Sequence, residues 1–224
     1  MAELSDAATA HTRILDSLRA LPDVSLAGAG TRIPIEGNRN NSTEQLVIED
    51  REYPDPLERD WGVDLTVSPG YFEALEVPLL RGRYFDARDG TSSSSVAVVG
   101  WSMAEKYWGG ADALEKRVRL GDPGQAQWIT IVGVVGDVRN DDADAPPSPT
   151  IYFPLDQRPA RALTYVVQTS ENTTSAAAAI RRAVQAAEPG LPIYRFRTMQ
   201  QVLWYDLEGV YIIVGLFGLN SNAF

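Results

Sequence analysis

The sequence predicts an α+β fold in which the two ends of the chain form a split α/β subdomain that carries an inserted, strand-rich (mainly β) subdomain. Three observations predict this class. A helical pattern followed by an extended segment opens the chain, and strand, helix and strand patterns return together in its last third. Between them, short strand patterns alternate with turn residues. One of these patterns, Trp128–Val135, is apolar at both alternating sets of positions, which is typical of a strand covered on both faces.

The first expected element is a helix over Asp6–Leu21. Its apolar residues recur at helical spacing, and Pro22 ends it. We expect His11, the single histidine of the chain, on the polar side of this helix and exposed to solvent. The residues that follow, Val24–Ile33, are mostly small and predict a strand that runs close to another backbone.

The inserted subdomain is expected over residues 44–158. It opens with an acidic stretch, 44–64, which contains eight acidic residues and only two arginines. We expect this stretch to be a solvent-exposed, loosely packed segment. The pair Ser68-Pro69 is typical of a helix start, as N-cap and first helical residue. The elements expected in this subdomain are strand Trp61–Val67, helix Gly70–Leu75, strand Val96–Val99, helix Ser102–Trp108 and strands Arg117–Leu120 and Trp128–Val135.

Residues 162–205 are expected to pack with residues 5–33 in one α/β layer, because both stretches combine helix and strand patterns. The elements expected there are strand Leu163–Gln168, helix Thr173–Ala187, strand Ile193–Phe196 and a further helix capped by Thr198. Polar connectors at 36–44 and 158–162 are candidate hinges between the two subdomains.

Composition excludes several kinds of site. The chain has no cysteine, which excludes disulfides and thiolate metal sites, and its one histidine excludes His-rich metal centres. The formal net charge of −10 and the scattered arginines argue against a nucleic-acid partner, because phosphate binding needs a basic surface. The first twenty residues carry acids and no apolar core, so we do not expect them to act as a signal peptide.

No motif in the chain indicates catalysis, a cofactor or a metal. Gly28-x-Gly30 and Gly133–Gly136 do not open a helix as a phosphate-binding loop does. The acidic stretch Asp137–Asp144 offers oxygen ligands of the kind Ca²⁺ prefers, but it lacks the glycine and the distal glutamate of an EF-hand loop. We therefore expect a solvated acidic loop there, and we name no catalytic, cofactor-binding or metal-binding residue.

The apolar run Gly209–Leu219 leaves two interpretations open. Its eleven residues fall short of the ~20 that span a bilayer. The run fits a buried strand or helix end, and it also fits the first half of a membrane helix.

Six motifs in order resemble a known family. They begin with VSPGYFEALEVPLLRGRYFDARD and continue with VAVVGWSMAEKYWGGADALEKRVRL and WITIVGVVGDVR. The remaining three motifs are TIYFPLDQ, the block from ALTYVVQTS to AAEPGLPIYRF, and TMQQVL. The chain resembles the periplasmic core domain of MacB-like and FtsX-like ABC transporter permeases, in the duplicated-permease branch. It departs from the family pattern at Gly100-Trp101-Ser102, and it begins at the first helix where a strand normally precedes it.

The resemblance implies a porter-like subdomain built from the chain ends. Residues 206–224 would then be the start of a truncated membrane helix or a terminal tail. The implied function is non-catalytic: an extracytoplasmic domain of a cytoplasmic-membrane permease that relays motion of the membrane helices to substrate or partner proteins. The implied partners are a transporter ATPase subunit or domain, the transmembrane helices of the same permease and a periplasmic adaptor protein, with a dimeric full-length permease. No cofactor and no nucleic acid are implied.

A second function class remains open at this point. Thirty acidic residues and five tryptophans offer many combinations for a carbohydrate-binding or carbohydrate-active extracytoplasmic domain that uses paired carboxylates. The tryptophans that would serve it are Trp61, Trp101, Trp108, Trp128 and Trp204.

Overall fold

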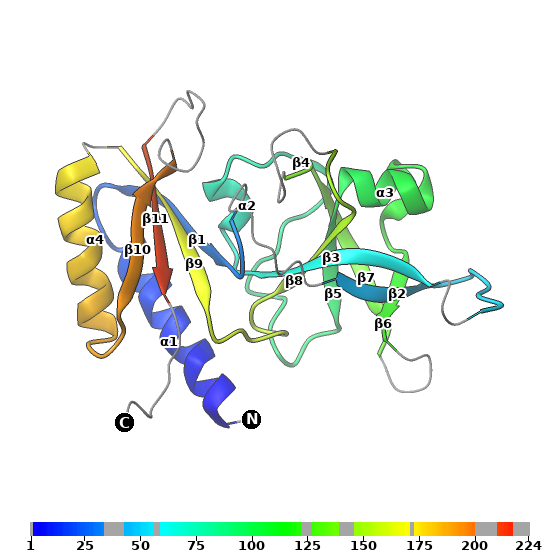
Figure 1. Ribbon diagram of the computed structural model, residues 1–224, viewed down its shortest axis with the longest axis horizontal. Coiled ribbons are helices and arrows are strands. Elements are labelled where there is room, and N and C mark those ends of the chain that lie inside the picture. The colour runs from blue at the N-terminus through cyan, green and yellow to red at the C-terminus, as the bar shows by residue number, and fades with distance from the viewer. Residues whose placement is uncertain are drawn as a thin grey trace. The chain divides into compact units, whose positions relative to one another are not determined.

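The computed structural model describes residues 2–33, 43–55, 59–121, 127–138, 146–170, 173–199 and 210–216 (Figure 1). Helices and strands are both abundant, and the predicted α+β class is confirmed. The chain divides into two compact units. Unit 1 comprises Met1–Ile33, Val67–Glu76 and Arg158–Phe224, and unit 2 comprises Pro34–Thr66 and Val77–Gln157. Unit 1 thus includes residues 67–76, which lie inside the stretch expected to form the inserted subdomain.

Unit 1 is a helix-covered antiparallel sheet. Its elements are α1 (Ala2–Arg19), β1 (Val24–Gly30), α2 (Tyr71–Ala74), β9 (Leu163–Thr169), α4 (Thr173–Ala187), β10 (Ile193–Thr198) and β11 (Val210–Leu216). The strand order is β10-β11-β9-β1, and each neighbouring pair is antiparallel. Helix α1 packs against β1 and α4, so the first and last thirds of the chain share one core.

Unit 2 is built around a ring of paired strands. Its elements are β2 (Thr43–Ile48), β3 (Asp60–Val67, whose last residue belongs to unit 1), β4 (Leu79–Gly82), β5 (Val96–Gly100), α3 (Trp101–Trp108), the short 3-10 helix η2 (Ala111–Ala113), β6 (Arg117–Leu120), β7 (Ile129–Val135) and β8 (Thr150–Pro154). The strands pair in the order β3-β2-β6-β7-β5-β8, and β8 pairs again with β3. Strand β7 also pairs with β4, which agrees with its predicted central place.

The C-terminal apolar run differs from one expectation. A membrane-helix start or a tail was expected over residues 206–224, but residues 210–216 form strand β11 between β9 and β10. The β-branched sequence of the strand favours an extended backbone, and two neighbouring strands satisfy its polar groups. The rest of 206–224, and the helix expected after Thr198, lie outside the described residues. None of the helices described here has both the length and the hydrophobicity of a membrane span.

Candidate functional site

The glycines of the Gly28-x-Gly30 pattern make room for the PGYF turn. A Cβ atom on Gly28 would lie 2.4 Å from the backbone nitrogen and Cα of Tyr71, and one on Gly30 would lie 2.6 Å from the Tyr71 ring. Ser68, expected as a helix N-cap, instead pairs with Ala29: the Ala29 N–H donates to Ser68 Oγ at 2.9 Å, and the Ser68 N–H donates to the Ala29 carbonyl at 2.8 Å. Helix α2 begins only at Tyr71. The glycine pattern therefore has a packing role.

A similar close approach lies where β4 ends beside β7, its antiparallel partner in unit 2. Gly82 has φ +71°, and a Cβ there would lie 2.2 Å from the Val132 carbonyl oxygen. On β7, a Cβ on Gly133 would lie 2.2 Å from the Arg83 carbonyl oxygen. At position 82, only glycine tolerates both the left-handed backbone and the close Val132 carbonyl oxygen. The pairing of β4 with β7 therefore positions the backbone of Arg83, the next residue.

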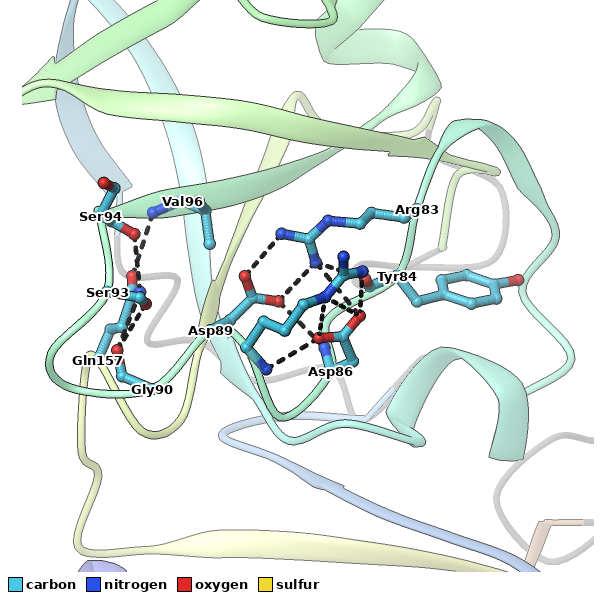
Figure 2. Close-up of polar contacts among 10 residues, drawn as sticks. Arg83, Tyr84, Asp86, Asp89, Gly90, Ser93, Ser94, Val96 and Gln157 are labelled. Atoms are coloured by element: carbon cyan, nitrogen blue, oxygen red, sulfur yellow. Dashed lines mark hydrogen bonds and ion pairs between the residues drawn. The ribbon is translucent and has the colours of Figure 1, made fainter.

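Arg83 holds the loop after β4 through a bidentate ion pair (Figure 2). Its Nη1 and Nη2 atoms each donate to one oxygen of Asp89 at 2.7 Å. The Asp89 side chain is only 4% exposed, and Asp89 Oδ2 also accepts the Asp86 N–H at 3.0 Å. The hydrogen bonds to Asp89 raise the pKa of Arg83. Buried Phe85 lies inside the same loop.

A second, exposed pair flanks the first. The Arg88 guanidinium donates to both oxygens of Asp86, and this contact lowers the pKa of the Asp86 carboxyl. Both carboxylates of the loop are thus paired with arginines. The lowered pKa keeps Asp86 ionised, which suits it poorly to act as a general acid.

The side-chain amide of Gln157 binds the next part of the loop, residues 90–96, as Figure 2 shows. Its Nε2 donates to Ser93 Oγ at 2.9 Å, to the Ser94 carbonyl at 3.0 Å and to the Gly90 carbonyl at 3.3 Å. Its Oε1 accepts the Val96 N–H at 3.1 Å. One side chain therefore joins the end of β8 to the loop that leads into β5. Together with Arg83–Asp89 it forms a brace, which we call the loop brace (residues 83–96 and 157).

Asp137 opens the stretch considered as a Ca²⁺ loop, and it serves as a helix cap. Its two oxygens accept the Ser102 N–H at 2.9 and 3.1 Å, and Oδ1 also accepts the Ser102 hydroxyl at 2.9 Å. A carboxylate at the start of α3 is favoured by the helix dipole. Residues 139–145 lie outside the described part of the chain. Over the described ranges, no group of three or more His, Asp or Glu residues is arranged to hold a metal.

The tryptophans lie in several different environments. Trp61 (44% exposed) and Trp101 (37% exposed) are on the surface, and Trp108 packs beside the core of unit 2. The Lys106 ammonium lies 4.6 Å from the Trp61 ring centroid, and Arg119 lies 4.2 Å from that of Trp128. Basic side chains of the same chain thus lie against the rings of Trp61 and Trp128 in cation–π contacts. Trp204 lies outside the described residues.

His11 was expected in solvent, and this expectation is wrong. The side chain is buried in unit 1, where Nδ1 lies 2.5 Å from the Tyr165 hydroxyl. Burial lowers the pKa of His11 and raises the pKa of Tyr165. The spacing Ala7, His11, Ile14 and Leu18 is the buried stripe of the helix, and it is the sequence signal that would have placed His11 correctly.

Comparison with known proteins gives one family and several similar folds. The family described as "MacB-like periplasmic core domain" matches residues 8–183. No curated protein matches the chain. The periplasmic region of MacB from Actinobacillus actinomycetemcomitans is 15% identical, with 77% of this chain and 72% of that chain covered and a TM-score of 0.54.

Two further solved structures are similar. The extracellular domain of the noncanonic ABC-type transporter YknZ from Gram-positive bacteria is 17% identical, with 79% and 82% of the two chains covered and a TM-score of 0.51. A permease-protein domain from Porphyromonas gingivalis is 18% identical, with 92% of this chain and 77% of that chain covered and a TM-score of 0.51. At these identities the three structures support the fold.

Proposed function

Since the chain belongs to the family of MacB-like periplasmic core domains, we propose that it is a non-catalytic extracytoplasmic relay within an ABC transporter permease. Domains of this family belong to ABC transporters, in which an ATPase supplies the energy. The relay would transmit movement of the permease's own membrane helices to a substrate or to a periplasmic adaptor protein. The working unit would be a dimer of the full-length permease beside its ATPase.

The observation that carries the proposal is the way in which the chain joins its two units. It passes from one unit to the other four times, after Ile33, Thr66, Glu76 and Gln157. Two of these crossings adjoin the polar connectors 36–44 and 158–162 that the sequence offered as hinges. A relay needs stiff bodies joined at a few points, and these four crossings are the candidate joints.

Each unit has internal bracing that suits a stiff body. In unit 2 the strands close a ring, and the loop brace ties the β4–β5 connection to β8. In unit 1 the Arg19 guanidinium donates to the Ala27 carbonyl at 3.1 Å and to the Pro69 carbonyl at 2.6 Å. These bonds join α1, β1 and the PGYF turn.

Non-catalytic action also agrees with the polar groups of the described residues. The carboxylates of Asp86 and Asp89 are paired with arginines, and that of Asp137 caps a helix. The single histidine is buried against Tyr165. Each of these groups already has a partner that holds the fold together.

A cross-link between the units tests the relay. Arg182 on α4 of unit 1 and Glu105 on α3 of unit 2 are both exposed, and the chain has no native cysteine. The variant R182C/E105C would be joined by bifunctional maleimides of graded length in the full-length permease. We expect export to stop with the shortest linker that reacts, while ATP binding is unchanged.

The matched control keeps both cysteines inside unit 1. Arg13 and Glu188 form an ion pair between α1 and the end of α4, so R13C/E188C cross-linking joins two side chains that already touch. We expect this cross-link to leave export unchanged. Normal export by the R182C/E105C cross-linked protein would show that movement between the units is not needed.

A further inference from the structure

We propose that His11 and Tyr165 form a proton-sensitive latch in unit 1. While His11 is neutral, the latch holds the connector 158–162 against α1, and protonation of the imidazole releases the connector. The relay does not require this device. The latch and its test concern unit 1 alone, so the latch can fail while the relay holds, and the reverse.

The pair lies deep inside unit 1. His11 of α1 is 1% exposed and Tyr165 of β9 is fully buried. Tyr165 lies opposite Ala29 of β1 on one side and Val214 of β11 on the other. His11 Nδ1 and the Tyr165 hydroxyl are 2.5 Å apart. A polar contact thus ties α1 to the middle of the sheet.

The surroundings of the pair decide where its protons lie. Among the described residues, the Tyr165 hydroxyl has no hydrogen-bond partner other than His11 Nδ1. If Nδ1 carried the imidazole proton, it would donate to the hydroxyl, whose own proton would be left buried without an acceptor. In the opposite arrangement Tyr165 donates to Nδ1 and the imidazole proton is on Nε2. Neutral His11 is therefore the Nε2–H tautomer.

The connector lies beside the imidazole. The backbone of Ala160 and of Arg161 offers hydrogen-bond acceptors to His11. Since Tyr165 already occupies Nδ1, these acceptors serve the Nε2–H group. Nε2 is buried and has no partner in good hydrogen-bonding geometry among the described residues, so this interaction is weak. The latch therefore holds the connector by a contact that breaks at small cost.

The charged groups around the pair give little support to an imidazolium. Glu188, at the end of α4, favours protonated His11, but its carboxylate is paired with Arg13 of α1. Strand β1, which also packs against α1, has no titratable side chain. The charged side chains of the connector, Arg158 and Arg161, are both positive and cannot balance a further positive charge.

Protonation of His11 breaks the arrangement of the pair. Nδ1 then carries a proton and can no longer accept one from Tyr165. The hydroxyl must turn to accept from Nδ1–H, which leaves its own proton buried without an acceptor and beside a buried charge. Burial lowers the pKa of His11, and the backbone acceptors of the connector offset this effect only in part. Access to water would relieve both penalties.

The connector is the part of the surroundings that can yield. It contains no helix or strand, and Arg161 within it is exposed. By contrast, β9 is paired along both edges, and α1 is anchored by buried side chains such as Ile14 and Leu18. Water therefore reaches the imidazolium when the connector moves away. Because the chain enters the connector directly after Gln157, release would loosen one of the four crossings between the units.

The single histidine makes the protonation state directly measurable. The whole chain would be produced with ¹⁵N-labelled histidine, so that its NMR spectrum contains one imidazole. We expect the Nε2–H tautomer at about pH 7.5, and protonation with a midpoint below 6.5, the ordinary pKa of histidine. The Nδ1–H tautomer, or a midpoint at or above 6.5, would contradict the latch.

A spin label on the connector tests the release. Arg161 is exposed and the chain has no native cysteine, so R161C takes one label at an exposed position. We expect the motion of the label to quicken severalfold between pH 7.5 and about pH 5, with the midpoint that NMR gives for His11. A label at T12C, exposed on α1, should keep the same motion. Unchanged motion at R161C would mean that the connector is not released. An equal change at T12C would mean that the whole unit loosens, which also overturns the latch.

Two further variants assign the effect to the pair. In Y165F no hydroxyl donates to Nδ1, so the neutral form loses a hydrogen bond, and we expect both midpoints to shift together to higher pH. In E188Q the pair is intact, and release should persist at a slightly lower pH because a carboxylate that favours the imidazolium is gone. Midpoints unchanged by Y165F, or a pH response that disappears in E188Q, would contradict the latch.

Discussion

Arg83 and Asp89 form a bidentate ion pair in which both nitrogen–oxygen distances are 2.7 Å. The Asp89 side chain is almost fully buried, whereas one third of the Arg83 side chain faces solvent. The pair therefore joins a buried carboxylate to a guanidinium that stays partly hydrated. Asp89 also accepts the Asp86 N–H, so a single carboxylate holds both the start and the turn of the loop after β4.

Replacing Asp89 tests the loop brace. We expect D89A to lower the free energy of unfolding by about 2–3 kcal/mol, less than for a fully buried pair because Arg83 can turn to water. Urea denaturation would measure the loss. The exposed neighbour supplies the control: D86N should leave the unfolding midpoint unchanged, since surface ion pairs contribute little. Equal effects of the two variants would contradict the special role of Asp89.

Replacing Gly28 tests the close approach of β1 to the PGYF turn. In G28A the added Cβ would lie 2.4 Å from backbone atoms of Tyr71, so the turn must move. We expect a loss of about 1–3 kcal/mol in the free energy of unfolding. Gly190 lies in unit 1 with no atom within 4 Å of an added Cβ, so G190A should be close to neutral. A G28A protein as stable as G190A would contradict the packing role.

Stability should depend on pH through His11. Burial holds the folded-state pKa of His11 below its ordinary value of 6.5, so the unfolded chain binds the proton more readily. The contribution of neutral His11 is therefore complete above pH 6.5 and is lost as the pH falls from 6.5 through the lowered folded-state pKa. We expect the midpoint of thermal unfolding to fall over this range.

The variant H11Q isolates this effect from the titration of carboxylates. We expect the difference in unfolding midpoint between the original protein and H11Q to shrink as the pH is lowered from 7.5 to about 5. A difference that stays constant over this range would mean that His11 is not the group responsible.

Replacing Asp137 tests the helix cap. D137A removes both acceptors of the Ser102 N–H, and we expect a loss of about 1–2 kcal/mol in the free energy of unfolding. D137N keeps one acceptor oxygen and should recover part of the loss. If Ca²⁺ raised the melting temperature of the original protein but not of D137A, a metal role would replace the cap.

The sequence predicted elements whose pattern is local. Helices α1 and α4 and the central strand β7 follow from apolar spacing, and the glycines near Tyr71 were expected to lie close to another backbone. The family resemblance was identified from six short motifs in order. Apolar spacing and motifs can both be recognised from residues that are close together in the sequence.

The rest depended on contacts between distant residues. Asp137 and Ser102 are 35 positions apart, and His11 and Tyr165 are 154 apart, so no local pattern pairs them. The choice between strand and helix for residues 210–216 likewise depends on contacts with residues elsewhere in the chain. An apolar run of this length fits either structure, and in the fold its backbone pairs with β9 and β10, which come earlier in the chain.

Distance measurement between the units tests the relay most directly. Spin labels at R182C and E105C would report the distance between unit 1 and unit 2 in the full-length permease. The distance would be measured once with ATP bound to the ATPase and once with the ATPase free of nucleotide. A second pair at R182C and T12C, both in unit 1, would report any change within that unit. We predict that the distance between the units changes on ATP binding while the distance inside unit 1 stays the same. An unchanged distance between the units in a permease that is actively exporting would contradict the account.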